Sequence, residues 1–198
     1  MNKGMKSKSN LNLPNLLTMF RFVIIPAMMV MLTYRDALVN FFAAFLFLTA
    51  SLTDIMDGYI ARKYNIVTNM GKILDPLADK LMVLIALIML IPLGRAPAWI
   101  VALIVLRETA VTSLRAVAAT EGTVISASSL GKYKNLFQVI ATLFLIMYHN
   151  YPLIKVGGIP ISIDFYTSGI LILWVALILT LWSGFDYFAK FFRKSIKS

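Results

Sequence analysis

Six long apolar segments, separated by short polar breaks, constrain the fold of this chain more than any other feature of its sequence. Their approximate ranges are 15–34, 37–62, 74–93, 97–118, 132–149 and 165–192. A helix needs about 20 mostly apolar residues to cross a bilayer. Because 60% of the residues are hydrophobic and only 14% are charged, a water-soluble domain is excluded. We therefore predict an all-α, polytopic integral membrane protein with six transmembrane helices.

The two ends of the chain differ in composition from its middle. Residues 1–12 and 193–198 are polar and basic, and we expect them to be tails on a single six-helix transmembrane domain over residues 13–192. Asn12 is a candidate N-cap of the first helix, and Pro14 fits its first turn, where a missing N–H costs nothing. Residues typical of turns separate the apolar segments at 34–36, 92–97, 120–131 and 151–160.

Basic residues predict how the chain is oriented in the membrane. With six spans, both termini lie on one side, and that side then holds all but three of the 19 Lys and Arg residues. The other side keeps Arg35, Arg95 and Lys155. Because cytoplasmic loops carry an excess of Lys and Arg, we expect both termini and segment 54–80 to face the cytoplasm, in the cell inner membrane. The same distribution explains the net charge of +10 without a nucleic-acid partner.

Residue types that build many other active sites are missing or isolated in this chain. There is no cysteine, which excludes disulfides, thiolate nucleophiles and cysteine-rich metal sites. The single histidine, His149, stands beside Asn150 and Tyr151 in a polar break, and we expect it to be an ordinary loop residue. A metal site in this protein is therefore expected to use oxygen ligands.

Four aspartates form the most informative cluster of the sequence. Asp54 and Asp57 are three residues apart, and Asp75 and Asp79 are four apart. At about 100° per residue, each pair lies on one face of its own helix. Gly71 and the loop before it allow the second helix to turn back against the first. We expect the four carboxylates to converge between two neighbouring helices.

Such a cluster of acids needs compensation. A charged Asp within a span costs roughly 2.5–3.5 kcal/mol, and four together repel one another. Protonation and divalent cations are the two remedies, because Arg62, Lys72 and Lys80 are too few and too peripheral to neutralise the cluster. We favour metal, since carboxylate ligands without His or Cys suit Mg²⁺ or Mn²⁺. Four shared carboxylates suit a site for two ions of the kind that serves phosphoryl transfer.

Small residues and an arginine accompany the first pair of aspartates. Gly58 and Ala61 lie on the same helix face as Asp54 and Asp57, and Arg62 is one step round. This face can admit a flat base and ribose close to the backbone, while the arginine can hold a phosphate through its fork of donors. Taken alone, the small residues would indicate only close helix packing. Beside four aspartates, we prefer a nucleotide site.

The pattern D-x2-D-G-x2-A-R-x8-G-x3-D-x3-D over residues 54–79 resembles the signature of the CDP-alcohol phosphotransferases, and all its fixed positions are filled. The resemblance implies six transmembrane helices, a homodimer, and cleavage of the pyrophosphate of a CDP-linked donor with release of CMP. It also implies that Asp79 is a general base for the attacking hydroxyl. The metal ligands implied are Asp54, Asp57, Asp75 and Asp79. The CDP pocket implied consists of Asp54, Gly58, Ala61, Arg62 and Gly71.

Further stretches are similar to one branch of that family, the bacterial phosphatidylglycerophosphate synthases. They are 13–21, 70–81, 107–115 and 126–134. The resemblance covers nearly the whole chain and implies phosphatidyl transfer from CDP-diacylglycerol to sn-glycerol 3-phosphate, which gives phosphatidylglycerophosphate and CMP. Where those synthases commonly have Thr-Gly-Leu-Arg, this chain has Thr112-Ser113-Leu114-Arg115, which keeps the arginine.

Four cations on two of the predicted helices fit a dianionic acceptor. They are Arg107, Arg115, Lys132 and Lys134. Glycerol 3-phosphate needs fixed positive charge beside the acidic metal site, whereas a neutral acceptor does not. The alternative is that these cations only anchor helix ends to lipid headgroups. Arg107 lies about ten residues into its segment, deep for an anchor, and Glu108 beside it is a candidate partner.

Three other functions stay open at this point. The same chemistry could use another acceptor: phosphatidylglycerol, as in a cardiolipin synthase, inositol phosphate or serine. A divalent-cation transporter could use the carboxylates as its transport site, although the chain shows no internal repeat of the inverted-repeat kind. A non-catalytic membrane scaffold is disfavoured, because a scaffold has no use for four convergent acids.

Overall fold

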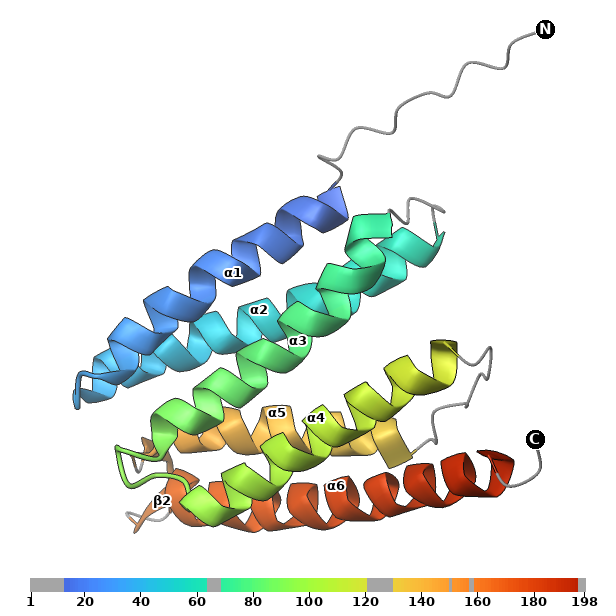
Figure 1. Ribbon diagram of the computed structural model, residues 1–198. Helices are drawn as coiled ribbons and strands as arrows, with labels where there is room; N and C mark the ends of the chain where they lie inside the picture. The colour runs from blue at the N-terminus through green and yellow to red at the C-terminus, as the bar shows by residue number, and fades with distance from the viewer. Residues whose placement is uncertain (1–12, 64–68, 121–129, 150, 157–158, 196–198) are drawn as a thin grey trace, which may run out of the picture.

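The structure is a computed structural model that describes the backbone of residues 13–63, 69–120, 130–149, 151–156 and 159–195. Within these ranges it describes the side chains of 23–53, 80–118, 120, 131, 133–149 and 163–193. The elements are α1 (Leu13–Leu32), α2 (Ala37–Lys63), α3 (Asn69–Leu90), α4 (Ala98–Thr120), α5 (Leu130–Met147), β1 (Tyr151–Val156), β2 (Ile159–Ile163) and α6 (Phe165–Ser195). Figure 1 shows the helices side by side in one bundle, with the hairpin at one end.

Each expected apolar segment coincides with one of the helices. The largest difference is at the start of α3, at Asn69 instead of residue 74. Two ends differ by three residues, because α3 ends at Leu90 instead of residue 93 and α6 ends at Ser195 instead of residue 192. The extension of α3 is Asn-Met-Gly-Lys-Ile, and that of α6 is Arg-Lys-Ser. A hydrophobic pattern ends at the first polar residues, whereas the backbone hydrogen bonds of a helix can continue through them. Hydrophobicity therefore predicted the helices but not their full length.

The break at 151–160, expected to be a turn, contains a β-hairpin that the sequence interpretation missed. Strands β1 and β2 pair antiparallel, with Tyr151 opposite Ile163 and Val156 opposite Ile159. The ladder is irregular between Pro152 and Ile154. Both strands are rich in Ile and Val, which favour extended backbone. The two residues between the strands, Gly157-Gly158, lie outside the described residues, and such a pair is typical of a two-residue hairpin connection.

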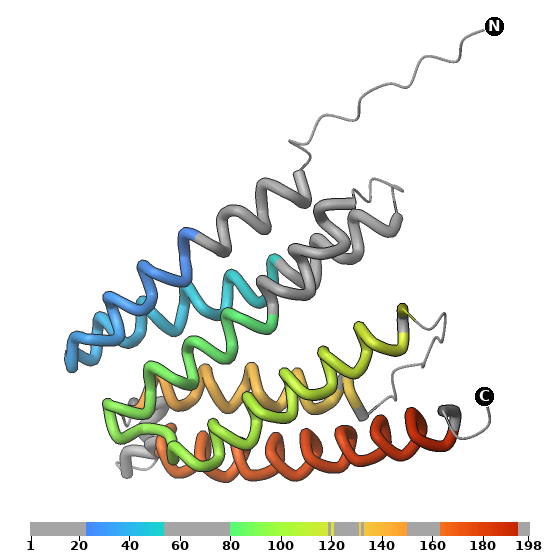
Figure 2. The backbone as a smooth tube through the Cα atoms, in the orientation of Figure 1, coloured from blue at the N-terminus to red at the C-terminus, as the bar shows by residue number. Residues whose placement is uncertain are grey.

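Successive helices run in alternating directions, so the bundle has two ends (Figures 1 and 2). At the end that we call the hairpin end, the hairpin lies at the same end of the bundle as two helix junctions (Figure 1). These are the junction of α1 with α2 and that of α3 with α4. At the other end, which we call the aspartate end, α2 finishes and α3 begins within the aspartate motif. Helix α5 packs along α6, α1 packs on α2 and α3, and α4 packs on α6.

Two N-caps start helices at the hairpin end. The backbone N–H groups of Leu38 and Val39 donate to Asp36 Oδ1 at 2.8 and 3.1 Å, which caps α2. The N–H of Thr167 donates to Asp164 Oδ1 at 3.1 Å, which caps α6. An aspartate at this position satisfies donors that have no partner inside the helix. The polar breaks therefore fix where the chain turns back into the bundle.

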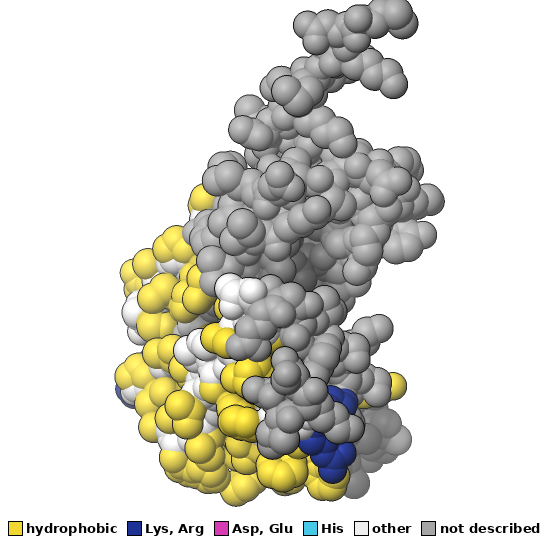
Figure 3. Space-filling model, turned by 45° about the vertical axis from the view of Figure 1, so that its right-hand side comes forward, with side chains coloured by type: hydrophobic (Ala, Val, Ile, Leu, Met, Phe, Trp, Pro, Cys, Tyr) yellow, Lys and Arg dark blue, Asp and Glu magenta, His cyan; other side chains and the backbone are white. Residues whose placement is uncertain are grey.

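The core of the bundle is apolar, and so is much of its outer surface. The largest fully buried side chains are Met28, Leu32, Phe47, Met82, Leu87, Leu90, Ile100, Ile104, Leu145, Ile146 and Leu173. Large apolar side chains such as Leu38, Leu106, Trp182 and Phe185 are exposed. Figure 3 shows a largely hydrophobic face with Lys and Arg side chains gathered beside its lower edge. Exposed apolar surface of this extent is expected where lipid surrounds a protein.

Helix α6 is long and apolar enough over Phe165–Arg193 to cross a membrane, and it is the one helix in the described part of the chain that meets this criterion in full. Shorter apolar stretches lie within α1, α2, α3 and α5. The helical bundle is therefore consistent with a polytopic membrane protein. That all six helices cross the bilayer, with both termini on the cytoplasmic side, stays a prediction.

Candidate active site

The four aspartates lie on the two helical stretches that meet the junction at the aspartate end. Asp54 and Asp57 are in the last turns of α2, and Asp75 and Asp79 are in the first half of α3. A helical backbone gives each pair the spacing of one face. Their side chains lie outside the described residues, as do those of the predicted nucleotide-site residues Gly58, Ala61, Arg62 and Gly71. Convergence of the carboxylates therefore remains a prediction.

The donor set at this end suits a hard divalent cation. Its carboxylates are oxygen ligands of the kind that Mg²⁺ and Mn²⁺ prefer, and no cysteine exists in the chain to favour a softer metal. Among the side chains that the structure describes, no other group of three or more His, Asp or Glu residues could hold a metal ion. His149, at the hairpin end, lies with its Nε2 atom 3.4 Å from the Asn40 amide nitrogen.

An ion cluster lies between α4 and α5. Arg107 Nη1 donates to Glu108 Oε1 at 3.0 Å, and Lys134 Nζ donates to the same oxygen. Glu108 and Lys134 are each only 5% exposed. A buried charge is costly unless it is paired and hydrogen-bonded. The carboxylate of Glu108 therefore offsets the unfavourable free energy of burying two cations, one from α4 and one from α5.

Arg107 also contacts helix α6. Arg107 Nη2 donates to Ser183 Oγ at 2.8 Å, and Ser183 Oγ donates to the carbonyl of Thr180 at 3.1 Å. A Cβ atom built on Gly184 would lie 3.0 Å from Arg107 Cγ. The guanidinium therefore crosses α6 at a place where small side chains leave room for it, and it links α4 to α6.

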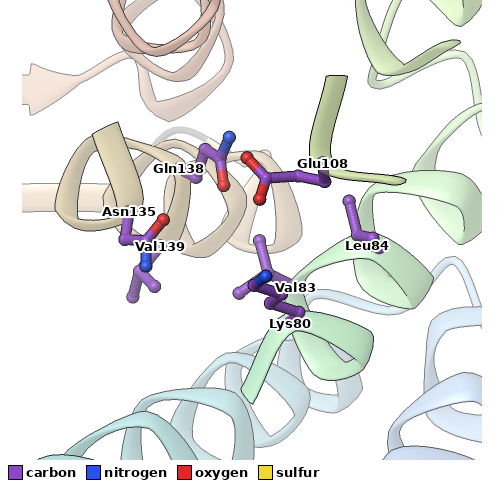
Figure 4. Close-up of a pocket in the computed structure, with 7 residues that line it drawn as sticks. All are labelled: Lys80, Val83, Leu84, Glu108, Asn135, Gln138 and Val139. Atoms are coloured by element: carbon purple, nitrogen blue, oxygen red, sulfur yellow. The ribbon is translucent and has the colours of Figure 1, made fainter. Parts of the chain in front are cut away.

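A pocket of about 300 Å³, including its open mouth, adjoins this cluster. It lies among α3, α4 and α5 and is lined by Lys80, Val83, Leu84, Glu108, Asn135, Gln138 and Val139 (Figure 4). In Figure 4 the carboxylate of Glu108 points from α4 toward Gln138, across the space that Lys80 and Val83 border. Lys80 follows Asp79 directly in the sequence and donates to Thr112 Oγ1 at 2.9 Å. A residue of the pocket wall thus directly follows the last aspartate of the motif in the sequence.

The structure describes the side chains of three of the four predicted acceptor cations. Arg107 and Lys134 meet at Glu108. Arg115 is exposed, and its guanidinium lies over the ring of Tyr187 at 5.7 Å. The side chain of Lys132 lies outside the described residues. The structure therefore joins two of the cations through Glu108 and places Arg115 about two turns further along α4, where it also contacts α6.

Sequence reasoning named Glu108 only as a partner of Arg107 and missed several polar groups around it. Gln138, for example, is buried and donates to Thr180 Oγ1 at 3.0 Å. Ser183 is buried as well. A signal for these residues was available, because polar side chains within apolar segments are rare and face the bundle interior. That signal does not identify which polar residues meet, since they are far apart in the sequence.

Known proteins match this chain over most of its length. The family model described as CDP-alcohol phosphatidyltransferase matches residues 11–182. The CDP-diacylglycerol–glycerol-3-phosphate 3-phosphatidyltransferase of Bacillus subtilis is 44% identical over 191 residues, which cover 90% of this chain and 94% of that protein. The protein of the same name from Rickettsia typhi is 40% identical over 177 residues, which cover 89% of this chain and 95% of that protein.

A third relative is more distant. The probable phosphatidylglycerophosphate synthase of Mycobacterium tuberculosis is 35% identical over 185 residues, which cover 92% of this chain and 82% of that protein. The family to which these matches point generally depends on divalent cations, in agreement with the oxygen-donor set on α2 and α3. The family match includes the complete aspartate motif and both helices of the ion cluster. The chain therefore belongs to the CDP-alcohol phosphatidyltransferase family.

Proposed function

We propose that this protein transfers a phosphatidyl group from CDP-diacylglycerol to sn-glycerol 3-phosphate, which gives phosphatidylglycerophosphate and CMP. The observation that carries the proposal is the 44% identity to a transferase of that name along 90% of the chain. The residues support it independently, because the aspartate motif is complete and a buried cation cluster lies beside a pocket. Anionic phospholipid biosynthesis is the corresponding cellular role.

The donor is assigned to the ends of α2 and α3. We expect Asp54, Gly58, Ala61, Arg62 and Gly71 to receive the CDP group, with the small residues admitting the base and ribose close to α2. We expect two divalent cations, Mg²⁺ or Mn²⁺, held by Asp54, Asp57, Asp75 and Asp79. Bound there, they would neutralise the pyrophosphate and the charge that develops on it during transfer.

The acceptor is assigned to the cationic region that α4 and α5 provide. Glycerol 3-phosphate carries two negative charges near neutral pH, so it needs fixed cations. Those assigned are Arg107, Arg115, Lys132 and Lys134. Glu108, which contacts Arg107 and Lys134, lines the pocket on which Lys80 also borders. Hydrogen-bonding groups on its wall, such as Asn135 and Gln138, suit a ligand that carries hydroxyl groups.

Asp79 is assigned as the general base. It accepts the proton of the acceptor hydroxyl while that oxygen forms a bond to the lipid-side phosphorus. The bond from this phosphorus to the oxygen of CMP breaks, CMP leaves, and phosphatidylglycerophosphate stays in the membrane. We prefer this direct in-line displacement to a covalent phosphatidyl-aspartate. The position of Asp79 directly before the pocket residue Lys80 supports the assignment.

The excess of Lys and Arg predicted for one side supports a cytoplasmic position of the aspartate end. We propose a multi-pass protein of the inner membrane, with its active site at the cytoplasmic level and CDP-diacylglycerol entering from the bilayer. Membership of the family further supports a homodimer as the working unit. Crosslinking of the purified protein in detergent, with detection of a two-chain species, would test this arrangement.

The decisive experiment measures CMP release from CDP-diacylglycerol by the purified protein, with and without glycerol 3-phosphate. We expect release only when both substrates are present, loss of release in EDTA, and recovery when Mg²⁺ or Mn²⁺ is added back. Phosphatidylglycerol, inositol phosphate and serine serve as competing acceptors. Turnover with one of them and not with glycerol 3-phosphate would change the acceptor. Metal uptake into proteoliposomes without CMP release would support a transporter instead.

A further inference from the structure

Glu108 is the only acidic residue among the buried side chains that the structure describes. It lies in the middle of α4, away from either helix end, so a capping role is excluded. An apolar side chain would fill this place at lower cost, because removing a carboxylate from water is unfavourable. Its presence there is explained by the groups that it contacts.

The contacts of Glu108 converge on one atom. Its Oε1 atom accepts from Arg107 Nη1 and from Lys134 Nζ. The two cations belong to different helices and would repel each other without the carboxylate between them. Arg107 has a second fixed contact, at Ser183 on α6. Lys134 has Glu108 as the contact described for its ammonium, so its position depends more directly on this carboxylate.

The cluster is also placed where it can affect a ligand. Glu108 lines the pocket among α3, α4 and α5, on which Lys80 also borders (Figure 4). A carboxylate that served packing alone would not need to reach a cavity. The ammonium of Lys134, on α5, contacts this lining carboxylate. Any shift of its ammonium is therefore expected at the wall of the pocket.

We propose that Glu108 is a positioning residue for the acceptor. It holds the ammonium of Lys134 and the guanidinium of Arg107 in fixed places beside the pocket, so that the phosphate of the acceptor meets pre-arranged cations. This inference rests on the proposed function, because it takes these cations to be the acceptor site. Glu108 acts through its two partners and takes no part in the bond changes. Removal of its charge should therefore raise the KM for the acceptor and leave the KM for the CDP-linked donor unchanged.

The first test compares Glu108→Gln with the unchanged protein. Glutamine keeps the shape of the side chain but removes its charge. We expect the KM for glycerol 3-phosphate to rise at least about tenfold, because the loss of one partner from a buried, hydrogen-bonded charge pair weakens binding by at least this factor. The KM for CDP-diacylglycerol should stay within about twofold. Equal changes in both KM values, or a change in kcat alone, would overturn the proposal.

Two further variants serve as controls for Glu108→Gln. Glu108→Asp keeps the charge on a shorter side chain, and we expect it to recover part of the lost acceptor affinity. Asp186→Asn is the matched control, because Asp186 is also paired with a lysine, Lys190 at 2.6 Å, but on the exposed face of α6. It should leave both KM values unchanged. An equal rise in the KM for glycerol 3-phosphate in Asp186→Asn would show a general charge effect and would contradict the proposal.

The second test asks whether Glu108 acts through Lys134. In a Lys134→Met background, adding Glu108→Gln should change the KM for glycerol 3-phosphate by less than about twofold, because Lys134 is already absent and Arg107 is still held by Ser183. A further tenfold rise would mean that Glu108 acts independently, and the proposal would fail. This comparison uses the double and the Lys134 variants only. Neither variant buries the lysine charge without its carboxylate. The comparison therefore stays valid even when Glu108→Gln alone fails to fold.

These tests separate the inference from the proposed function. If the unchanged protein releases no CMP with glycerol 3-phosphate, the proposed function fails before any variant is compared. If it does release CMP and Glu108→Gln shows no selective effect on the acceptor, the inference alone fails. The midpoint of thermal unfolding in detergent, measured for the same variants, reports the ion cluster itself. Coupling of the two substitutions in that midpoint without coupling in KM would show a purely structural pair and would also overturn the inference.

Discussion

The two ends of the bundle bury cations in different ways. At the hairpin end, Arg95 is 3% exposed, donates to the carbonyl of Ile146 at 3.0 Å, and lies over the Tyr148 ring at 4.5 Å. Toward the aspartate end, Arg107 and Lys134 share the carboxylate of Glu108. The first arrangement joins a side chain to backbone and an aromatic ring. The second joins charged side chains beside a cavity.

This difference separates a structural use of charge from a functional one. A carbonyl at the end of α5 needs a donor because it has no partner within its helix, and Arg95 supplies one. The contact fixes the end of α5 against the segment that precedes α4. Paired charges beside a cavity cost more to bury, but they can meet an ionic ligand. Substitutions at the hairpin end should therefore change stability, and those at the aspartate end should change activity.

The strongest test of this contrast makes one chemical change at both ends. Asp79→Asn should reduce CMP release by roughly 10²–10⁴-fold, because it removes the proposed general base, while the protein still inserts and dimerises. Asp164→Asn should leave release unchanged, because asparagine also caps a helix N-terminus well. CMP release by the purified variants measures both. Retained turnover in Asp79→Asn would remove the general-base assignment.

Arg95→Met should produce the largest loss of stability. It removes the donor of the Ile146 carbonyl and the cation over the Tyr148 ring, and an unpaired buried carbonyl costs about 1–3 kcal/mol. We expect the midpoint of thermal unfolding in detergent to fall by several degrees. Both KM values of the protein that remains folded should be unchanged. A selective rise in the KM for glycerol 3-phosphate would break the proposed division between the two ends.

A smaller effect is expected from alanine at two glycines of α6. A Cβ atom on Gly169, toward the hairpin end, would lie 2.9 Å from Leu145 Cδ2 and 3.2 Å from the Leu145 backbone nitrogen. Backbone cannot move aside, so Gly169→Ala should lower stability by about 1–3 kcal/mol. On Gly184 the neighbour is instead the side chain of Arg107. Gly184→Ala should therefore raise the KM for glycerol 3-phosphate a few-fold with little change in the unfolding midpoint.

Both glycine variants are measured by the same two assays, thermal unfolding and acceptor KM. Alanine favours helix over glycine by roughly 1 kcal/mol, and this gain opposes the steric loss equally at both positions. The difference between the two variants is therefore more informative than either value. An identical pattern at both positions would show that Gly184 provides only helix packing.

The smallest effect concerns pH at the hairpin end. The hydroxyl of Thr167 donates to the carboxyl of Asp164 and is the main reason that its pKa lies below the ordinary value of 3.8. The backbone N–H of Thr167 also donates to this carboxyl and has a smaller effect in the same direction. A carboxyl whose pKa is lower in the folded protein than in the unfolded chain stabilises the fold at any pH above the unfolded pKa. This stabilisation is lost as the pH falls through the pKa of the folded protein. The unfolding midpoint of the unchanged protein should thus exceed that of Asp164→Ala by a constant amount near neutral pH. The excess should shrink only below about pH 4. A difference that declines already near pH 6 would contradict this origin.

The sequence by itself determined the helices and the motif. Apolar segments of about 20 residues leave the backbone no better structure than a helix, because its hydrogen bonds are then satisfied within the segment. The spacing of Asp54, Asp57, Asp75 and Asp79 is also local information, since helical periodicity alone puts each pair on one face. These local features were sufficient to indicate the family, which the comparisons confirmed.

Only the tertiary structure decided which polar groups meet. Arg107, Lys134 and Ser183 belong to three different helices, and nothing in the periodicity of one helix specifies its neighbours. The sequence interpretation named four cations without their contacts, and packing joined two of them through Glu108 and placed Arg115 over Tyr187. The hairpin was missed for a related reason, because strand pairing depends on a partner segment. Local pattern fixes an element and its faces, while contacts between elements depend on the packing of the whole bundle.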